Sequence, residues 1–294
     1  MVRGAGMRGR GMDFEHRFKT SRWAEDLLIS ALNSTLGLIT VRFGLSVVRP
    51  ESELIYGNSI LKEPDLLIFK LADLSGEQAR LLESEDLEGA DRRRFETGSD
   101  LSFVFRKAVA AIEVEFSPYK AREMKDRDWQ PRSLDAWNRR PLKHANAPTA
   151  PNVIVKEEDL PRLTAWEQHT GVPIIVVHLF DQEAFAVLLN TLCNFNDAYE
   201  AGSSSEQIKL QVTTGIFKTL QSYDRVDAQG AGEKKWIFRV PPCAAFKVGD
   251  LADVKVKAQL GTSTSQKYVS HIIFEEGQLK VSPQFLEFLA TYRT

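Results

Sequence analysis

The chain has 294 residues, of which 43% are hydrophobic and 27% charged, and its formal net charge is −2. This composition excludes general disorder and suits one large or two modest globular domains. No apolar run is long enough to span a membrane, and the first residues lack the apolar core of a signal peptide, so we expect a cytoplasmic protein without a membrane partner. Cys193 and Cys243 have no metal-ligand or redox spacing, which favours free thiols.

The N-terminal region is expected to form an arm and a helix. Residues 1–12 are rich in Gly and Arg and lack periodicity, which is typical of a flexible arm. Apolar residues recur at helical spacing from residue 14 to about 36, and Gly37 is the expected stop. A turn of about 100° per residue places Glu25 on the apolar face of this helix and Asp26 outside it.

A Glu on an apolar helix face needs a partner, because burying a lone charge is costly. Two alternatives stay open for Glu25. It could form an ion pair with a basic residue at the edge of the core, such as Arg22 or Arg42. It could instead support a metal site beside the sheet.

Short apolar and β-branched stretches predict strands at 38–48, 65–70 and 109–116, and the charged stretch 75–96 predicts a helical insertion between the last two. Side chains alternate along a strand, so Glu113 and Glu115 share a face, about 7 Å apart. Their apolar neighbours take the other face, which we expect to be the core side.

Two carboxylates on one face of a buried strand repel each other unless a cation lies between them. Mg²⁺ is the candidate, because it binds one or two carboxylates and keeps waters for a phosphate substrate. With Asp65, these acids predict a metal site made of Asp65, Glu113 and Glu115. The alternatives are that Asp65 is a turn residue and that Glu113 and Glu115 face solvent on an edge strand.

The motifs Pro64-Asp65 and Glu113-Val114-Glu115 resemble the PD-(D/E)XK nuclease superfamily, and within it the type II restriction endonucleases. Most members have Lys where this chain has Glu115, and a Glu-X-Glu variant is found in the BamHI-type enzymes. The resemblance covers roughly residues 13–190, and the region 117–160 resembles an AccI-like subgroup. It implies that Asp65 and Glu113 hold Mg²⁺, that Glu115 binds a second metal or takes a proton, and that Glu25 supports the site.

The stretch from 117 to 147 has eight Lys and Arg residues and four acids, together with Trp, Tyr, His and Asn. Arg, Asn and aromatic side chains suit contacts with phosphates and base edges. We therefore expect Lys120 to reach a phosphate beside the acids. The expected DNA-binding residues are Arg132, Arg139, Arg140, Lys143, His144 and Asn146. The alternative is a solvated segment of mixed charge.

Further elements follow in chain order. A Pro-rich loop is expected at 145–152, a helix at 156–170 and a strand buried on both faces at 173–180, in a parallel crossover. His178 in that strand is expected to be a hydrogen-bonded core residue. The serines at 203–205 predict a flexible break. The expected later elements are β-like segments at 207–216, 235–241, 253–260 and 267–275, and a helix at 283–291.

These patterns predict an α/β fold with a mixed central sheet of PD-(D/E)XK nuclease type, flanked by helices, and a β-rich C-terminal region. The expected units are an arm (1–12), a nuclease core (13–200) and a β-rich subdomain (201–294). The predicted function is Mg²⁺-dependent, sequence-specific cleavage of double-stranded DNA by a homodimer. The alternatives are a structure-selective repair or recombination nuclease of the same fold and a catalytically silent DNA-binding protein.

Overall fold

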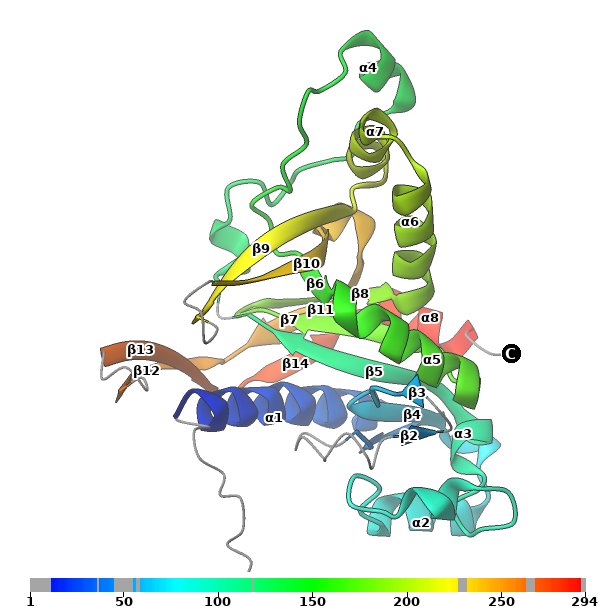
Figure 1. Ribbon diagram of the computed structural model, residues 1–294. Helices are drawn as coiled ribbons and strands as arrows, with labels where there is room; N and C mark the ends of the chain where they lie inside the picture. Colours follow the sequence, from blue (N-terminus) through cyan, green and yellow to red (C-terminus); the bar gives the residue numbers. More distant parts are fainter. Residues whose placement is uncertain are drawn as a thin grey trace, which may run out of the picture.

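The structure is a computed structural model, and it describes residues 12–35, 37–44, 55–56, 59–117, 119–226, 232–262 and 268–291. Its centre is a mixed seven-stranded sheet with helices on both faces (Figure 1). The predicted mixed α/β class is therefore confirmed. The arm expected at residues 1–12 lies almost wholly outside the described residues.

The central sheet has the strand order β1-β4-β5-β7-β8-β11-β14. Within it β5 and β7 are parallel, while the other neighbouring strands are antiparallel. The parallel pair confirms the crossover expected from the sequence. The strands are β1 (Leu38–Arg42), β4 (Leu66–Lys70), β5 (Ala108–Phe116), β7 (Ile174–Leu179), β8 (Glu183–Leu188), β11 (Phe246–Ala252) and β14 (Gln278–Val281).

Both faces of β5 are buried, whereas the sequence predicts a core on one face only. Ile112 and Val114 pack with α1 (Met12–Asn33) and α8 (Pro283–Thr291). Ala111 belongs to a second cluster, built with α5 (Leu160–Thr170) and α6 (Leu189–Ala201). Each face is covered because a central strand flanked by helices has no solvent side.

A smaller sheet of order β6-β10-β9 covers part of the second face (Figure 1). It consists of β6 (Val153–Lys156), β10 (Gly232–Val240) and β9 (Phe217–Val226). The remaining strands form the hairpins β2 (Ile55–Tyr56) with β3 (Ser59–Ile60) and β12 (Lys255–Thr262) with β13 (Tyr268–Glu275). The remaining helices are α2 (Gly76–Ser84), α3 (Val104–Lys107), α4 (Leu134–Arg139) and α7 (Ser204–Thr214).

Residues 207–214 belong to the helix α7, so the strand expected at 207–216 is wrong. Ser203, expected in a flexible break, is the N-cap of α7 and forms a capping box with Glu206. Gly215 ends the helix with a positive φ of 81°. Local capping thus determines the structure of this segment, because it satisfies the free backbone groups at both ends of the helix.

Other expected elements exist with different bounds. The strand expected at 38–48 ends at residue 42, with 45–50 outside the described residues, and the insertion 75–96 is helical only in α2, apart from a short 3-10 turn at 92–95. Lys156 ends β6 and does not begin a helix. The central sheet extends across the boundary expected at residue 200, because β11 and β14 belong to it. No helix in the described part of the chain has both the length and the apolarity to cross a membrane.

Candidate acid site on the central sheet

Asp65 lies directly before β4 and beside Glu113 of β5. The antiparallel register pairs Leu66 with Ile112, so the next position out places Asp65 alongside Glu113. One carboxylate oxygen of Asp65, Oδ2, accepts a 2.7 Å hydrogen bond from the backbone N–H of Val114. Its carbonyl accepts one of 2.8 Å from the N–H of Phe43. Asp65 is therefore fixed by both neighbouring strands, and its side chain does more than form a turn.

Glu113 is only 5% exposed in the middle of the sheet, so it does not lie on the solvent face of an edge strand. Its Oε1 lies 2.6 Å from the ammonium nitrogen of Lys62, which also lies 3.1 Å from Oδ2 of Asp159 at the start of α5. Although burial opposes its charge, these carboxylates raise the pKa of Lys62. The protein thus supplies a cation to the acid site.

Asp65 and Glu115, the other acids of the site, lie close to further carboxylates. Burial, together with the neighbouring Glu113 carboxylate, raises the pKa of Asp65 well above its usual value. Burial also raises the pKa of Glu115 to about 7, although Lys62 and Lys156 act in the opposite direction. Groups with raised pKa values concentrate at functional sites, because such sites bring like charges together away from water.

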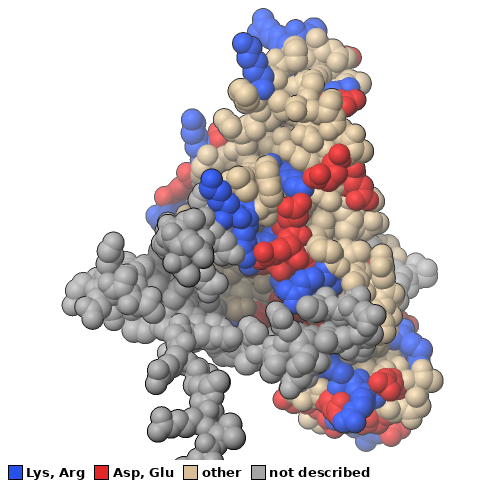
Figure 2. Space-filling view, in the orientation of Figure 1, with Lys and Arg blue, Asp and Glu red and all other residues tan. Residues whose placement is uncertain are grey.

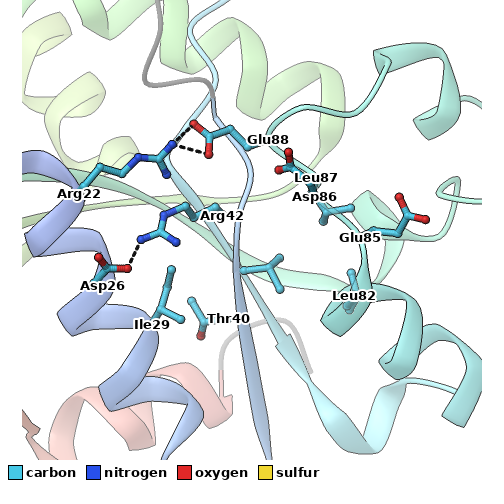
Figure 3. Close-up of a pocket in the computed structure, with 11 residues that line it drawn as sticks. Arg22, Asp26, Ile29, Thr40, Arg42, Leu82, Glu85, Asp86, Leu87 and Glu88 are labelled. Atoms are coloured by element: carbon cyan, nitrogen blue, oxygen red, sulfur yellow. Dashed lines mark hydrogen bonds and ion pairs between the residues drawn. The ribbon is translucent and has the colours of Figure 1, made fainter. Parts of the chain in front are cut away.

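Glu25 is buried on α1, as expected, and Asp26 is exposed. The Glu25 carboxylate accepts hydrogen bonds from Arg42 Nε at 3.0 Å and Arg22 Nη1 at 3.3 Å. The ion-pair alternative for Glu25 is therefore confirmed. Both arginines also line a hollow of about 620 Å³ between α1, β1 and the segment after α2, where Arg22 pairs with Glu88 (Figure 3).

The residues present fit a divalent cation at Asp65 and Glu113. Glu113 Oε2 is buried and has no hydrogen-bond partner in the described part of the structure. An unpartnered carboxylate oxygen in a buried site needs a cation or a donor, because its desolvation is otherwise uncompensated. Among the described residues, however, no group of three or more His, Cys, Asp and Glu side chains is arranged to hold a metal ion. One or two carboxylates are enough for Mg²⁺ when water and phosphate complete its shell.

His178 is a core residue, as expected. Its Nδ1 accepts a 3.3 Å hydrogen bond from the backbone N–H of Ile154, and its Nε2 lies 2.8 Å from Ser117 Oγ. The ring stacks on Phe180. Burial lowers the pKa of His178 to about 3, and Arg239 adds to this effect. A neutral imidazole with both nitrogens engaged forms part of the scaffold.

Lys120 forms an ion pair with Glu123 and not with the acids Asp65, Glu113 and Glu115. Its exposed ammonium pairs with Glu123 at 2.8 Å, beyond the end of β5. Lys62 occupies the place at the acids where a cation was expected.

The basic segment, residues 117–147, lies partly on the body of the protein and partly at the tip formed around α4 (Figure 1). Arg127 pairs with the buried Glu183 at 2.6 Å, and Arg132 donates a 2.7 Å hydrogen bond to the carbonyl of Ala136. The tip around α4 lies far from β5 in Figure 1 and carries Lys and Arg side chains in Figure 2. Arg139 is the last residue of α4, and Arg140, Lys143, His144 and Asn146 follow it; all five are exposed. Within one chain, the part of this segment that forms α4 therefore lies apart from the acid site.

Sequence reasoning missed Lys62, Lys156 and Asp159. Lys62 has a local signal, because it stands three residues before Asp65 in the segment that enters β4. Asp159 and Lys156 have none, because they reach the site only when α5 and β6 pack over the sheet.

Searches of protein-family profiles, curated proteins and solved structures find no match to this chain. The function must therefore be argued from the site.

Proposed function

We propose that the protein is a Mg²⁺-dependent endonuclease that cleaves double-stranded DNA, in the manner of a type II restriction endonuclease. The observation that carries the proposal is the pairing of Asp65 with Glu113, whose Oε2 is buried and has no hydrogen-bond partner among the residues that the structure describes. A site with more carboxylates than cations is suited to bind a metal ion. Hydrolysis of a phosphodiester is the chemistry that such a metal ion and several acids support.

In this proposal Asp65 and Glu113 would hold Mg²⁺, which when bound would neutralise the scissile phosphate and acidify a water molecule. Glu115 would accept the proton of the attacking water or take part in holding a second ion, because a pKa of about 7 suits proton transfer near neutral pH. Lys62 would hold Glu113 in place and offer its ammonium group to the phosphate. Glu25 would act indirectly, by fixing Arg22 and Arg42 against the sheet.

Cleavage of both strands of a palindromic site needs two acid sites related by a two-fold axis, so the proposal includes a homodimer. A cytoplasmic location would give it access to DNA. The exposed basic residues of the tip would then contact DNA bound at either site.

Lys62 also favours a second candidate, a DNA-binding protein without catalysis. An internal ammonium group already neutralises part of the acid cluster, which is how a structural ion-pair network would be built.

Incubation with plasmid DNA in Mg²⁺ tests the proposal, with EDTA and Glu113→Gln as controls. We expect discrete, reproducible fragments, and sequencing of their ends would identify the cut site. A smear, or a preference for branched substrates, would indicate a structure-selective nuclease. DNA binding with no cleavage in Mg²⁺ would support the silent candidate and contradict ours.

A further inference from the structure

A second hollow, of about 870 Å³, lies beyond the end of β5, between the loop 145–152 and the β9–β10 strands. Its volume is within the range of small-molecule sites, which is roughly 300–1,000 Å³. Ser117, which lines it, lies two residues after Glu115, about 7 Å further along the chain. The hollow therefore adjoins the acid site along the direction of β5.

Cations from separate elements line this hollow. Arg239 of β10 is held by Thr219 Oγ1 at 3.2 Å and by Gln221 Oε1 at 2.7 Å, which fixes its guanidinium group. Lys120 and Lys125 come from the segment after β5. Glu123 lies among them and pairs with Lys120, so the lining is cationic overall. Fixed guanidinium and ammonium groups are the usual partners of phosphate oxygens.

The lining also offers groups for a base. The Asn152 side chain is 4% exposed, and its Nδ2 donates to the carbonyls of Pro148 and Ala150. Its Oδ1 has no partner among the described residues. Tyr119 is 60% exposed, which leaves its ring able to stack. Asn152 Oδ1 is buried, so the group that suits a nucleobase is the exposed ring of Tyr119, which phosphate alone does not need.

We propose that this hollow binds one nucleotide of a DNA strand, with its phosphate against Arg239 and the lysines and its base against Tyr119. This inference rests on the proposed function, because the strand at the acid site is the one that would enter the hollow. It makes the hollow, and not only the basic tip, a determinant of DNA affinity.

The test measures binding and cleavage separately on one fluorescein-labelled DNA duplex of mixed sequence. Binding is followed by anisotropy in EDTA, and cleavage in Mg²⁺. The variants are Arg239→Gln, Lys125→Gln, Tyr119→Ala and Tyr119→Phe. Lys234→Gln is the matched control, because Lys234 is exposed on the same strand as Arg239 and faces the other side. Thermal unfolding checks that each variant is folded.

We expect Arg239→Gln to weaken binding about tenfold and to reduce the slope of affinity against salt by about one. Tyr119→Ala should weaken binding while Tyr119→Phe and Lys234→Gln do not. If Arg239→Gln and Tyr119→Ala bind like Lys234→Gln, the hollow does not take a nucleotide. A wild type that binds the duplex but never cuts it contradicts the proposed function alone, and the binding comparison still decides the hollow. A wild type that does not bind DNA contradicts both proposals.

Discussion

The ammonium nitrogen of Lys62 lies 2.6 Å from Oε1 of Glu113, while Oε2 of the same carboxylate has no partner in the described part of the structure. The two oxygens of Glu113 thus have different surroundings. One is neutralised by Lys62, and the other is buried without a partner among the described residues.

Removing an acid should separate binding from catalysis. Asp65→Asn, Glu113→Gln and Glu115→Gln should each reduce plasmid cleavage by at least about a hundredfold, because each removes a group that would hold the metal ion or move the proton. DNA affinity should be unchanged or higher, since negative charge near the phosphate is lost. Glu83→Gln, at an exposed position of α2, serves as the control. Wild-type cleavage by Glu113→Gln would refute the assignment of the metal site.

Lys62→Met should lower stability in EDTA by about 1–3 kcal/mol, because it leaves Glu113 and Asp159 without their common cation. Added Mg²⁺ should restore part of this loss, as measured by urea unfolding with and without the ion. Lys62→Arg should keep most of the stability. Equal stabilities of Lys62→Met and wild type in EDTA would mean that the pair is not formed.

Glu115 should make the metal-free protein lose stability as pH rises from about 4.5 to about 7, whereas His178, whose pKa is lowered to about 3, acts in the opposite direction up to about pH 6.5. The pKa of Glu115 is raised to about 7 in the folded state, so the folded chain holds a proton there that the unfolded chain has already lost. Asp65 has a raised pKa as well and acts in the same direction. Glu115→Gln should flatten this dependence and raise the melting temperature at pH 8. A melting temperature at pH 8 that is unchanged or lower in Glu115→Gln would contradict the assignment.

Glu25→Gln should affect folding more than chemistry. The substitution weakens the bonds from Arg22 and Arg42, and we expect a loss of about 1–3 kcal/mol in the free energy of unfolding. Cleavage measured below the melting temperature should fall less than tenfold. Asp26→Asn, one residue further along α1 and exposed, is the comparison. A loss of cleavage as large as that of Glu113→Gln would instead place Glu25 at the metal ion.

The basic tip should contribute to sequence recognition. We expect at least one of Arg139→Ala, Arg140→Ala and Lys143→Ala to relax specificity at one base, which a bidentate contact with guanine would read at about 1–3 kcal/mol. The remaining variants should weaken binding to all sequences alike. Arg132→Ala should lower stability too, since its guanidinium holds the carbonyl of Ala136. Gel shifts with the duplex that the protein cleaves, and with duplexes altered at single bases, measure these affinities. Lys280→Ala is the control.

Four strands of the central sheet, β1, β4, β5 and β7, could be predicted from short apolar runs, and α1 from its helical periodicity, whereas β8, β11 and β14 were not expected. The parallel pairing of β5 with β7 was expected from the helix that directly precedes β7, and the buried position of Glu25 from its angle on α1. These features depend on local sequence and on general rules of connection.

The rest of the site depends on contacts between distant segments. Asp159 approaches Lys62 across 97 positions, and nothing in either local sequence indicates this pairing. The helix α7 was missed for a different reason: the serines before it were interpreted as a break although they supply a cap. Ser is a preferred N-cap residue, so serines at such a position can start a helix.

The helix α1 contacts β1 at one edge of the central sheet and β14 at the other. The first described helix therefore touches the last strand of the chain, which ends at residue 281. During synthesis, this helix cannot complete its packing until β14, which ends at residue 281, has left the ribosome. Contacts of such large sequence separation slow folding, because a long chain segment must be closed before they form. In a nascent chain, α1 would thus reach its final packing only after β14 has been made.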